Sequence, residues 1–203
     1  IISAMHISIN QVRKSLLQKR SDFIKSPDFS VEYAHFLLHL QQFLQKHDEF
    51  ESVAFCWPYN HEPDLRALLV EWQTSQSNRE LLLPKIEPNK HLTFYTWSKS
   101  DDLINNSFGI LEPNPFARGV KRKVPDCIFI PCVGWLIHGG KYWRLGYGGG
   151  YFDRTIKALK HEGYIFTTVG VAFNWQEITE REWLPLDHDQ PLDYILTNNG
   201  LRG

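Results

Sequence analysis

The chain has 203 residues, of which 42% are hydrophobic and 22% are charged, proportions typical of a globular protein rather than a disordered or fibrous one. A chain of this length is expected to form a single domain over residues 1–203. Its formal net charge of -1 at pH 7 provides no overall attraction to nucleic acid or to anionic lipid, so neither is expected as a partner.

The first third of the chain is predicted to be mainly helical. Residues 11–24 are rich in Lys, Arg, Gln and Leu and contain neither Gly nor Pro, which predicts a helix capped near Asn10 and ended before Pro27. Residues 30–46 predict a second helix, because apolar side chains recur there at helical spacing (Phe36, Leu37, Leu40, Phe43 and Leu44). This second helix is expected to pack its apolar stripe against a core.

The rest of the chain alternates between short apolar runs and helical segments. Residues 64–72 and 153–161 predict helices, the latter closed by Gly163. The apolar runs predict strands at residues 52–57, 81–83, 92–97, 127–130, 168–173 and 194–197. Strands that are apolar on both faces require helices on both sides of the sheet. The pattern therefore predicts an α/β fold with a layered sheet.

Residues 112–126 are expected to form a long loop. It contains three prolines, one glycine and a local basic cluster (Arg118, Lys121, Arg122 and Lys123). Long loops inside a compact domain are often functional, so we expect this segment to be a lid rather than a domain boundary.

The apolar runs and the cysteines indicate the compartment. The longest run, residues 127–137, is interrupted by Pro131 and Gly134 and is far shorter than the roughly 20 residues needed to cross a bilayer. The N-terminal residues lack the pattern of a signal peptide. The three cysteines are odd in number, lack CxxC spacing and are expected to be plain buried or nearly buried thiols (Cys56, Cys127 and Cys132). A cytoplasmic protein without a membrane span is expected.

The most informative segment is residues 146–150, in which every residue except Tyr147 is glycine. Each glycine costs about 0.5–1 kcal/mol of extra backbone entropy relative to alanine. A tight turn is one explanation, although a turn usually needs only one or two glycines. The alternative is a loop whose amide N–H groups, together with the N-terminus of the following helix, bind phosphate oxygens. Arg144 and Arg154, on the two sides of the segment, would add charge-assisted contacts.

The glycine segment does not match the two commonest phosphate-binding motifs. It is not a Walker A loop, because no Gly-Lys-Ser or Gly-Lys-Thr closes it, and it lacks the acidic residue that follows a GxGxxG dinucleotide fingerprint. Instead RLGYGGGYFDR (residues 144–154), preceded by CIFIP (127–131) and followed by VGVAF (169–173), resembles the hallmark of the 5-formyltetrahydrofolate cyclo-ligase family.

Shorter motifs extend this resemblance over nearly the whole chain. They follow in the order of the family: Trp57-Pro58 with Glu62, Leu83-Pro84, residues 108–113, Leu184-Pro185, His188-Asp189 and Leu192-Asp193. The resemblance implies a three-layer α/β/α fold with a mostly parallel sheet, like that of the NagB/RpiA/CoA transferase-like proteins.

The resemblance also implies a reaction. The family uses ATP and magnesium to convert 5-formyltetrahydrofolate to 5,10-methenyltetrahydrofolate, ADP and phosphate, and so forms a cyclic C–N bond. The γ-phosphoryl group is transferred to the formyl oxygen, nitrogen 10 attacks the activated carbon, and phosphate leaves. Such a protein needs no nucleophile of its own and must chiefly position two substrates and neutralise developing charge. The expected partners are ATP and the folate, with or without a polyglutamate tail, and the expected assembly is a monomer.

Site residues are carried over from the family by position. The expected ATP contacts are Arg13, Arg144, Leu145, Gly146, Tyr147, Gly148, Gly149, Gly150, Tyr151 and Phe152. The expected folate contacts are Trp57, Glu62, Tyr147, Gly148, Gly149, Gly150 and Tyr151. Arg144 and Tyr151 are the expected catalytic residues, and Asp153 and Asp189 the expected magnesium ligands.

Without the resemblance, several of these residues have simpler explanations. Glu62 is then a solvated acid near the start of a helix, Asp153 a cap or dipole partner, and Trp57 a core residue. With it, Glu62 suits an acceptor for the N–H groups of the pterin ring, and two carboxylates suit magnesium bound together with phosphates.

The chain departs from the family pattern at three positions. Ile9 replaces the usual lysine one helical turn before Arg13, a role that Lys14 or His6 could take over. Leu136 replaces an acidic residue, and the residues after it are expected to form a lengthened turn that leads into the glycine segment. Phe152 replaces a tyrosine, with loss of only a hydroxyl group.

Two other functions were considered. A family member that has lost catalysis could bind nucleic acid or protein through its basic cluster, but Arg144, Asp153 and Asp189 are all retained. A sugar-phosphate isomerase or acyl-transfer enzyme could share the layered scaffold, because a fold alone does not fix function. The motif supplies no acid–base pair for that chemistry.

Overall fold

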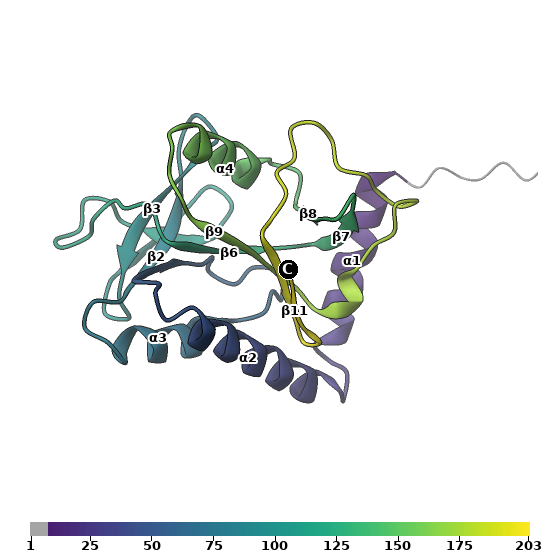
Figure 1. Cartoon of the computed structure of the whole chain (residues 1–203), viewed down its shortest axis with the longest axis horizontal. Coiled ribbons are helices and arrows are strands. Elements are labelled where there is room, and N and C mark those ends of the chain that lie inside the picture. Colours follow the sequence, from purple (N-terminus) through teal and green to yellow (C-terminus); the bar gives the residue numbers. More distant parts are fainter. Residues whose placement is uncertain (1–7) are drawn as a thin grey trace, which may run out of the picture.

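The computed structural model describes residues 8–203, and its centre is a seven-stranded sheet with the order β11-β10-β9-β6-β1-β2-β3 (Figure 1). The inner strands run parallel to one another: β10 (Tyr194–Thr197), β9 (Thr167–Val171), β6 (Cys127–Pro131), β1 (Ser52–Ala54) and β2 (Glu80–Ile86). The two edge strands, β3 (Leu92–Trp97) and β11 (Gly200–Arg202), are antiparallel to their neighbours. The predicted α/β fold with a mostly parallel sheet is confirmed.

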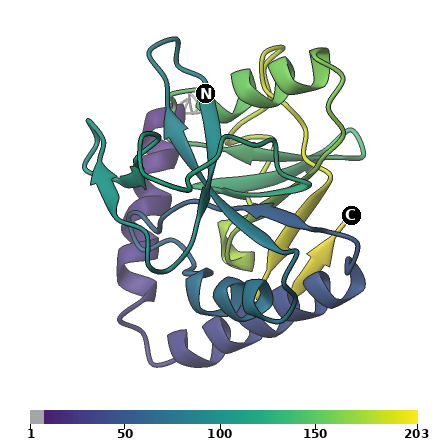
Figure 2. The same ribbon diagram turned by 90° about the vertical axis from the view of Figure 1, so that its left-hand side faces the viewer.

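Helices cover both faces of the sheet. α2 (Phe29–Lys46) and α3 (Arg66–Thr74) lie on one face and α4 (Tyr151–His161) on the other, which gives the three layers that the resemblance implied (Figures 1 and 2). α1 (Ile9–Phe23) lies at one end of the sheet, beside the hairpin of β7 (Gly134–His138) and β8 (Lys141–Leu145). Along residues 8–203, none of the helices combines the length and the apolar character needed to cross a membrane.

The core explains why the strands are continuously apolar. Val53, Leu81 and Leu83 belong to the cluster beneath α2 and α3, whereas Ala54 and Leu82 belong to the cluster beneath α4. Successive residues of a strand point to opposite faces, so a strand buried on both faces needs apolar side chains at every position.

Several predicted boundaries differ from the structure. Ser8, not Asn10, caps α1, because the Ser8 hydroxyl accepts a hydrogen bond from the Gln11 N–H (3.3 Å) and the Gln11 side chain accepts one from the Ser8 N–H (2.8 Å). β1 ends at Ala54, three residues before the predicted end. α4 begins at Tyr151, two residues earlier than predicted, because the preceding Gly150 adopts a left-handed conformation (φ 66°) that leads directly into the helix.

The edge strand β11 and two β-hairpins outside the main sheet escaped the sequence analysis. β4 (Leu103–Asn105) pairs with β5 (Leu111–Pro113), and β7 pairs with β8. The second hairpin corrects the expectation of a lengthened turn after Leu136. Its two turn residues, Gly139 and Gly140, both have positive φ angles (59° and 69°), as a tight two-residue hairpin turn requires.

Residues 112–126 are not the free lid that was predicted. The Thr96 N–H donates to the Lys121 carbonyl (2.8 Å), and the Lys123 N–H donates to the Phe94 carbonyl (3.0 Å). An antiparallel bridge between Tyr95 and Arg122 completes this pairing. Lys121, Arg122 and Lys123 are therefore held along the edge of β3.

Candidate active site

The candidate site lies at the carboxyl ends of β1 and β6. From β1 the chain passes to β2 on one side of β1, and β6 later joins its other side, so the strand order reverses at this point. Ligands of open α/β sheets bind at such switch points. Residues 146–150, termed the glycine loop, join β8 to α4 here. Arg144, in β8 just before the loop, donates to the carbonyl of Pro131 at the end of β6 (3.0 Å).

The glycine loop needs its glycines for two reasons. Gly148 and Gly150 have positive φ angles (100° and 66°), which side chains rarely tolerate. A Cβ atom on Gly146 would lie 2.9 Å from Nη1 of Arg144, and one on Gly150 would lie 2.8 Å from Nη1 of Arg154. The loop is therefore a bare backbone against which guanidinium groups pack, as expected for an anion-binding loop.

Two cavities share the glycine loop as a wall. The first, termed the aromatic cavity, has a volume of about 310 Å³ and is lined mainly by apolar and aromatic side chains together with Tyr147 and Gly149 of the loop. The second, termed the charged cavity, has a volume of about 300 Å³ and is lined by two arginines and two aspartates, by apolar side chains that include Trp183 and Leu186, and by Gly146 and Gly148. Arg144 and Gly150 line both cavities, so the ligands of the two cavities could meet beside these residues.

The aromatic cavity presents flat surfaces. The Trp57 ring carries the Arg66 guanidinium 4.5 Å from its centroid and packs edge-on against Trp97 at 5.8 Å. From the β4–β5 hairpin, Phe108 approaches Tyr151 edge-on with 6.2 Å between ring centroids. Such surfaces suit a planar heteroaromatic ligand.

Glu62 is the one acidic side chain of the aromatic cavity among the described residues. Its Oε1 accepts a hydrogen bond from the Tyr147 hydroxyl (2.8 Å) and its Oε2 accepts one from the Tyr59 N–H (3.0 Å). Burial raises the pKa of Glu62, and the Tyr147 hydrogen bond and the charge of Arg20 oppose that rise. A carboxylate has about four acceptor positions, so Glu62 can still accept N–H groups from a ligand.

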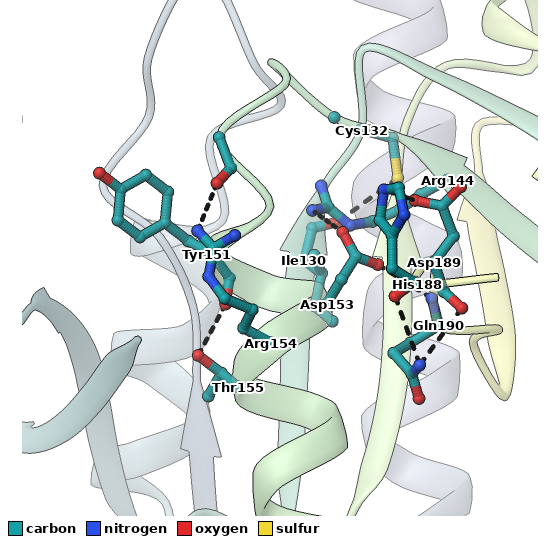
Figure 3. Close-up of polar contacts among 12 residues, drawn as sticks. Ile130, Cys132, Arg144, Tyr151, Asp153, Arg154, Thr155, His188, Asp189 and Gln190 are labelled. Carbon is teal, nitrogen blue, oxygen red and sulfur yellow. Dashed lines mark hydrogen bonds and ion pairs between the residues drawn. The ribbon is translucent and has the colours of Figure 1, made fainter. Parts of the chain in front are cut away.

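The charged cavity places two arginines against the glycine loop. Nε of Arg13 donates to the Gly146 carbonyl (2.8 Å), and its Nη1 donates to the side chain of Asn10 (2.8 Å). Nη2 of Arg144 lies 3.7 Å from Oδ2 of Asp153 (Figure 3). Burial lowers the pKa of Arg13 and Asp189 opposes this, but an arginine remains protonated at neutral pH in either case.

Two carboxylates line the same cavity (Figure 3). Oδ1 of Asp153 accepts the Gln190 N–H (3.0 Å), which fastens the segment containing Asp189 to the start of α4. Oδ2 of Asp189 accepts the Leu186 N–H (2.7 Å). Each carboxylate thus keeps one oxygen free of amide hydrogen bonds, a donor set that fits magnesium bound jointly with phosphates and water. No group of three His, Cys, Asp or Glu residues able to hold a metal occurs within residues 8–203, so phosphate oxygens would have to complete the ligand set.

The structure divides the expected site residues between the two cavities. The charged cavity receives Arg13, Arg144, Leu145, Gly146, Gly148, Gly150, Asp153 and Asp189. The aromatic cavity receives Trp57, Glu62, Arg144, Tyr147, Gly149, Gly150, Tyr151 and Phe152. Four of the expected ATP contacts, Tyr147, Gly149, Tyr151 and Phe152, therefore face the aromatic cavity and do not line the charged one.

The structure shows where the residues that depart from the family pattern lie. Ile9 lines the charged cavity, so an apolar side chain stands at that end. Lys14 is exposed and does not line the cavity, and His6 lies outside the described residues. Leu136 is buried beside Val12 and belongs to the packing between α1 and the β7–β8 hairpin.

Besides the apolar residues Trp183 and Leu186 of the charged cavity, sequence reasoning missed two features. One is Arg20, which lies seven residues after Arg13 and therefore on the same face of α1, a spacing that could have revealed it. The other is the β4–β5 hairpin, which contributes Asn106, Phe108, Ile110 and Leu111 to the aromatic cavity. Residues 108–113 of this hairpin were recognised as a family motif, but their pattern did not indicate that they line the cavity.

Comparison with known proteins gives a consistent result. The sequence profile of the 5-formyltetrahydrofolate cyclo-ligase family matches residues 7–198. The chain is 32% identical over 154 residues to the 5-formyltetrahydrofolate cyclo-ligase of Haemophilus influenzae, which covers 72% of this chain and 75% of that protein.

Two solved structures are similar over almost their whole length. The 5,10-methenyltetrahydrofolate synthetase of Aquifex aeolicus aligns with a TM-score of 0.70 and 29% identity, over 96% of this chain and 91% of that one. The corresponding synthetase of Mycoplasma pneumoniae aligns with a TM-score of 0.70 over 94% and 99%, and its 22% identity supports the fold alone.

The raised pKa of Glu62 predicts a pH-dependent stability effect. Folding disfavours the ionised carboxyl, so the wild type loses stability relative to a Glu62→Gln variant as pH rises above the usual carboxyl pKa. We expect the melting temperature of Glu62→Gln minus that of the wild type to be larger at about pH 8 than at about pH 5. The exposed Glu71→Gln on α3 is the control and should show no such change. A difference that is equal at both pH values, or larger at acid pH, would contradict this account.

Proposed function

The chain belongs to the 5-formyltetrahydrofolate cyclo-ligase family, and from that premise we propose that it converts 5-formyltetrahydrofolate and ATP to 5,10-methenyltetrahydrofolate, ADP and phosphate. The folate is accepted with or without a polyglutamate tail. The observation that carries the proposal is the pair of cavities that share the glycine loop and Arg144. One has the aromatic walls and buried acid suited to a pterin, and the other has the arginines suited to a triphosphate.

In this proposal the folate occupies the aromatic cavity. Its ring system stacks among Trp57, Tyr151 and Phe108, and Glu62 accepts hydrogen bonds from its N–H groups. The formyl group then lies toward the glycine loop, at the junction with the charged cavity. This arrangement accounts for the position of Tyr147, Gly149, Tyr151 and Phe152 on the folate side of the loop.

ATP occupies the charged cavity, with its phosphates along the glycine loop. Amide groups at the loop and at the N-terminus of α4 bind phosphate oxygens, and Arg13 adds a charge-assisted contact. Asp153 and Asp189 hold magnesium together with those phosphates, and magnesium supplies charge neutralisation on the phosphate oxygens. Arg144 lines both cavities and stabilises charge on the phosphoryl group as it passes between the substrates.

The proposed reaction requires no covalent bond between the enzyme and either substrate. The formyl oxygen attacks the γ-phosphorus and ADP leaves, which makes the formyl carbon electrophilic. Nitrogen 10 then bonds to that carbon, loses its proton, and expels phosphate together with the original formyl oxygen. Cys56 lines the aromatic cavity, but burial raises the pKa of its thiol, so it remains protonated and is a poor nucleophile.

The same observations bear on the remaining expectations. A monomer built as one domain over residues 1–203 is part of the proposal, in keeping with a length at which a single domain is usual. Cys127 and Cys132 are buried free thiols, in keeping with a reducing cytoplasm. The family membership and the two cavities support the enzyme and not the binding module.

The activity is tested with purified protein, 5-formyltetrahydrofolate, ATP and magnesium. We expect the absorbance of the methenyl product to appear together with ADP in equal amounts, and neither to form when ATP is replaced by a non-hydrolysable analogue. ATP hydrolysis without methenyl product, or no reaction of any kind, would overturn the proposed function.

The assignment of the charged cavity to ATP is tested by truncating Arg13. Arg13→Ala removes a cation from the proposed phosphate site, and we expect KM for ATP to rise by roughly tenfold or more and KM for the folate to rise less. Lys14→Ala is the matched control, because it removes the same charge from the same helix at an exposed position. An equal effect of the two variants on KM for ATP would reject this assignment.

A further inference from the structure

Arg20 of α1 is a buried cation that lines neither cavity. Its side chain is only 1% exposed. Its guanidinium donates to the carbonyl of Asn60 (2.7 Å), the carbonyl of Cys132 (3.2 Å) and the hydroxyl of Tyr147 (2.6 Å). None of these three acceptors is an anion, and a buried charge is costly unless an opposite charge lies near it.

The opposite charge is Glu62, reached through Tyr147. A guanidinium has no acceptor atom, so the Tyr147 oxygen must accept from Arg20, and its own proton points to Oε1 of Glu62 (2.8 Å). Burial raises the pKa of Tyr147, so the hydroxyl stays neutral and keeps that proton. The three side chains form one directed hydrogen-bond chain from α1 through the glycine loop to the segment after β1.

We propose that Arg20 is a positioning residue for folate binding: acting through Tyr147, it keeps Glu62 ionised and oriented toward the aromatic cavity. The proposal rests on the proposed function, because it requires that Glu62 accept hydrogen bonds from the folate. A protonated carboxyl group carries an O–H donor and cannot accept a pair of N–H groups as a carboxylate does.

Glu62 faces groups from five parts of the chain: Arg20 of α1, Tyr147 of the glycine loop, Arg144 of β8, Cys56 after β1 and Cys132 after β6. Burial raises the pKa of both thiols, that of Cys132 to about 12, so neither carries a charge in the neutral range. Arg20, Tyr147 and Arg144 therefore oppose the effect of burial on Glu62. Removing Arg20 should allow Glu62 to take up a proton at a higher pH.

The experiment measures the dissociation constant of 5-formyltetrahydrofolate by titration calorimetry as a function of pH. For Arg20→Met we expect affinity at neutral pH to fall by roughly tenfold or more, and the loss of affinity on acidification to begin at a higher pH than in the wild type. ATP affinity should be unchanged. Arg20→Lys keeps the charge, so its folate affinity should be lost on acidification at the same pH as in the wild type. We call this fall of folate affinity at low pH the acid limb.

Arg79→Met is the matched control. Arg79 is also a buried arginine, stacked on Trp72 and paired with Asp48 (2.5 Å), but it lies outside both cavities. We expect it to lower stability without moving the acid limb of folate binding. Should Arg20→Met fail to fold, Tyr147→Phe provides the second test, because loss of its hydrogen bond to Glu62 should move the acid limb in the same direction.

The proposal would be overturned if folate affinity were lost on acidification at the same pH in Arg20→Met and Tyr147→Phe as in the wild type. It would also be overturned if Arg20→Met lost as much affinity for ATP as for the folate. Failure of the proposed function is a separate outcome. A wild type that binds the folate but forms no methenyl product refutes the reaction and leaves the pH test of Arg20 decisive, whereas a wild type that does not bind the folate refutes both.

Discussion

The attachment of the glycine loop to α1 is the interaction on which the site depends. The loop has only one side chain of its own, so side chains from outside must hold it in place. Arg13 binds its backbone at Gly146, and Arg20, two helical turns later, binds its only side chain at Tyr147. α1 thus helps to hold the wall between the two cavities, as does Arg154 of α4 through the Gly149 carbonyl, and packing of Val12 and Leu16 against the β7–β8 hairpin holds α1 in place.

This arrangement brings several charged side chains together in the protein interior. Arg20, Glu62 and Arg144 are all at least nine-tenths buried, and each would be destabilising alone. Tyr147 links Arg20 to Glu62, and the carbonyls of Asn60, Pro131 and Cys132 accept hydrogen bonds from the two arginines. These contacts fix the side chains around the site, which suits a reaction whose main requirement is to hold two substrates in line.

What the sequence could reveal depended on how local each feature is. Strands such as β6 and β10 were predicted because burial on both faces makes them apolar at every position, and the glycine loop because its composition is unusual. The β7–β8 hairpin carried a signal, Gly139-Gly140, that was misread as a lengthened turn. The basic segment was misread as a lid, because its pairing with β3 depends on where the chain returns and not on any periodic pattern. Arg20 and the β4–β5 hairpin reach the site only through tertiary contacts.

The central claim is that the formyl oxygen and the γ-phosphate meet at the junction of the two cavities, beside Arg144. The most direct test uses 5-formyltetrahydrofolate that carries a heavy-oxygen label in its formyl group, followed by mass spectrometry of the phosphate released in a single turnover. The account predicts that the label is found in the inorganic phosphate. Unlabelled phosphate, formed together with the methenyl product, would contradict it.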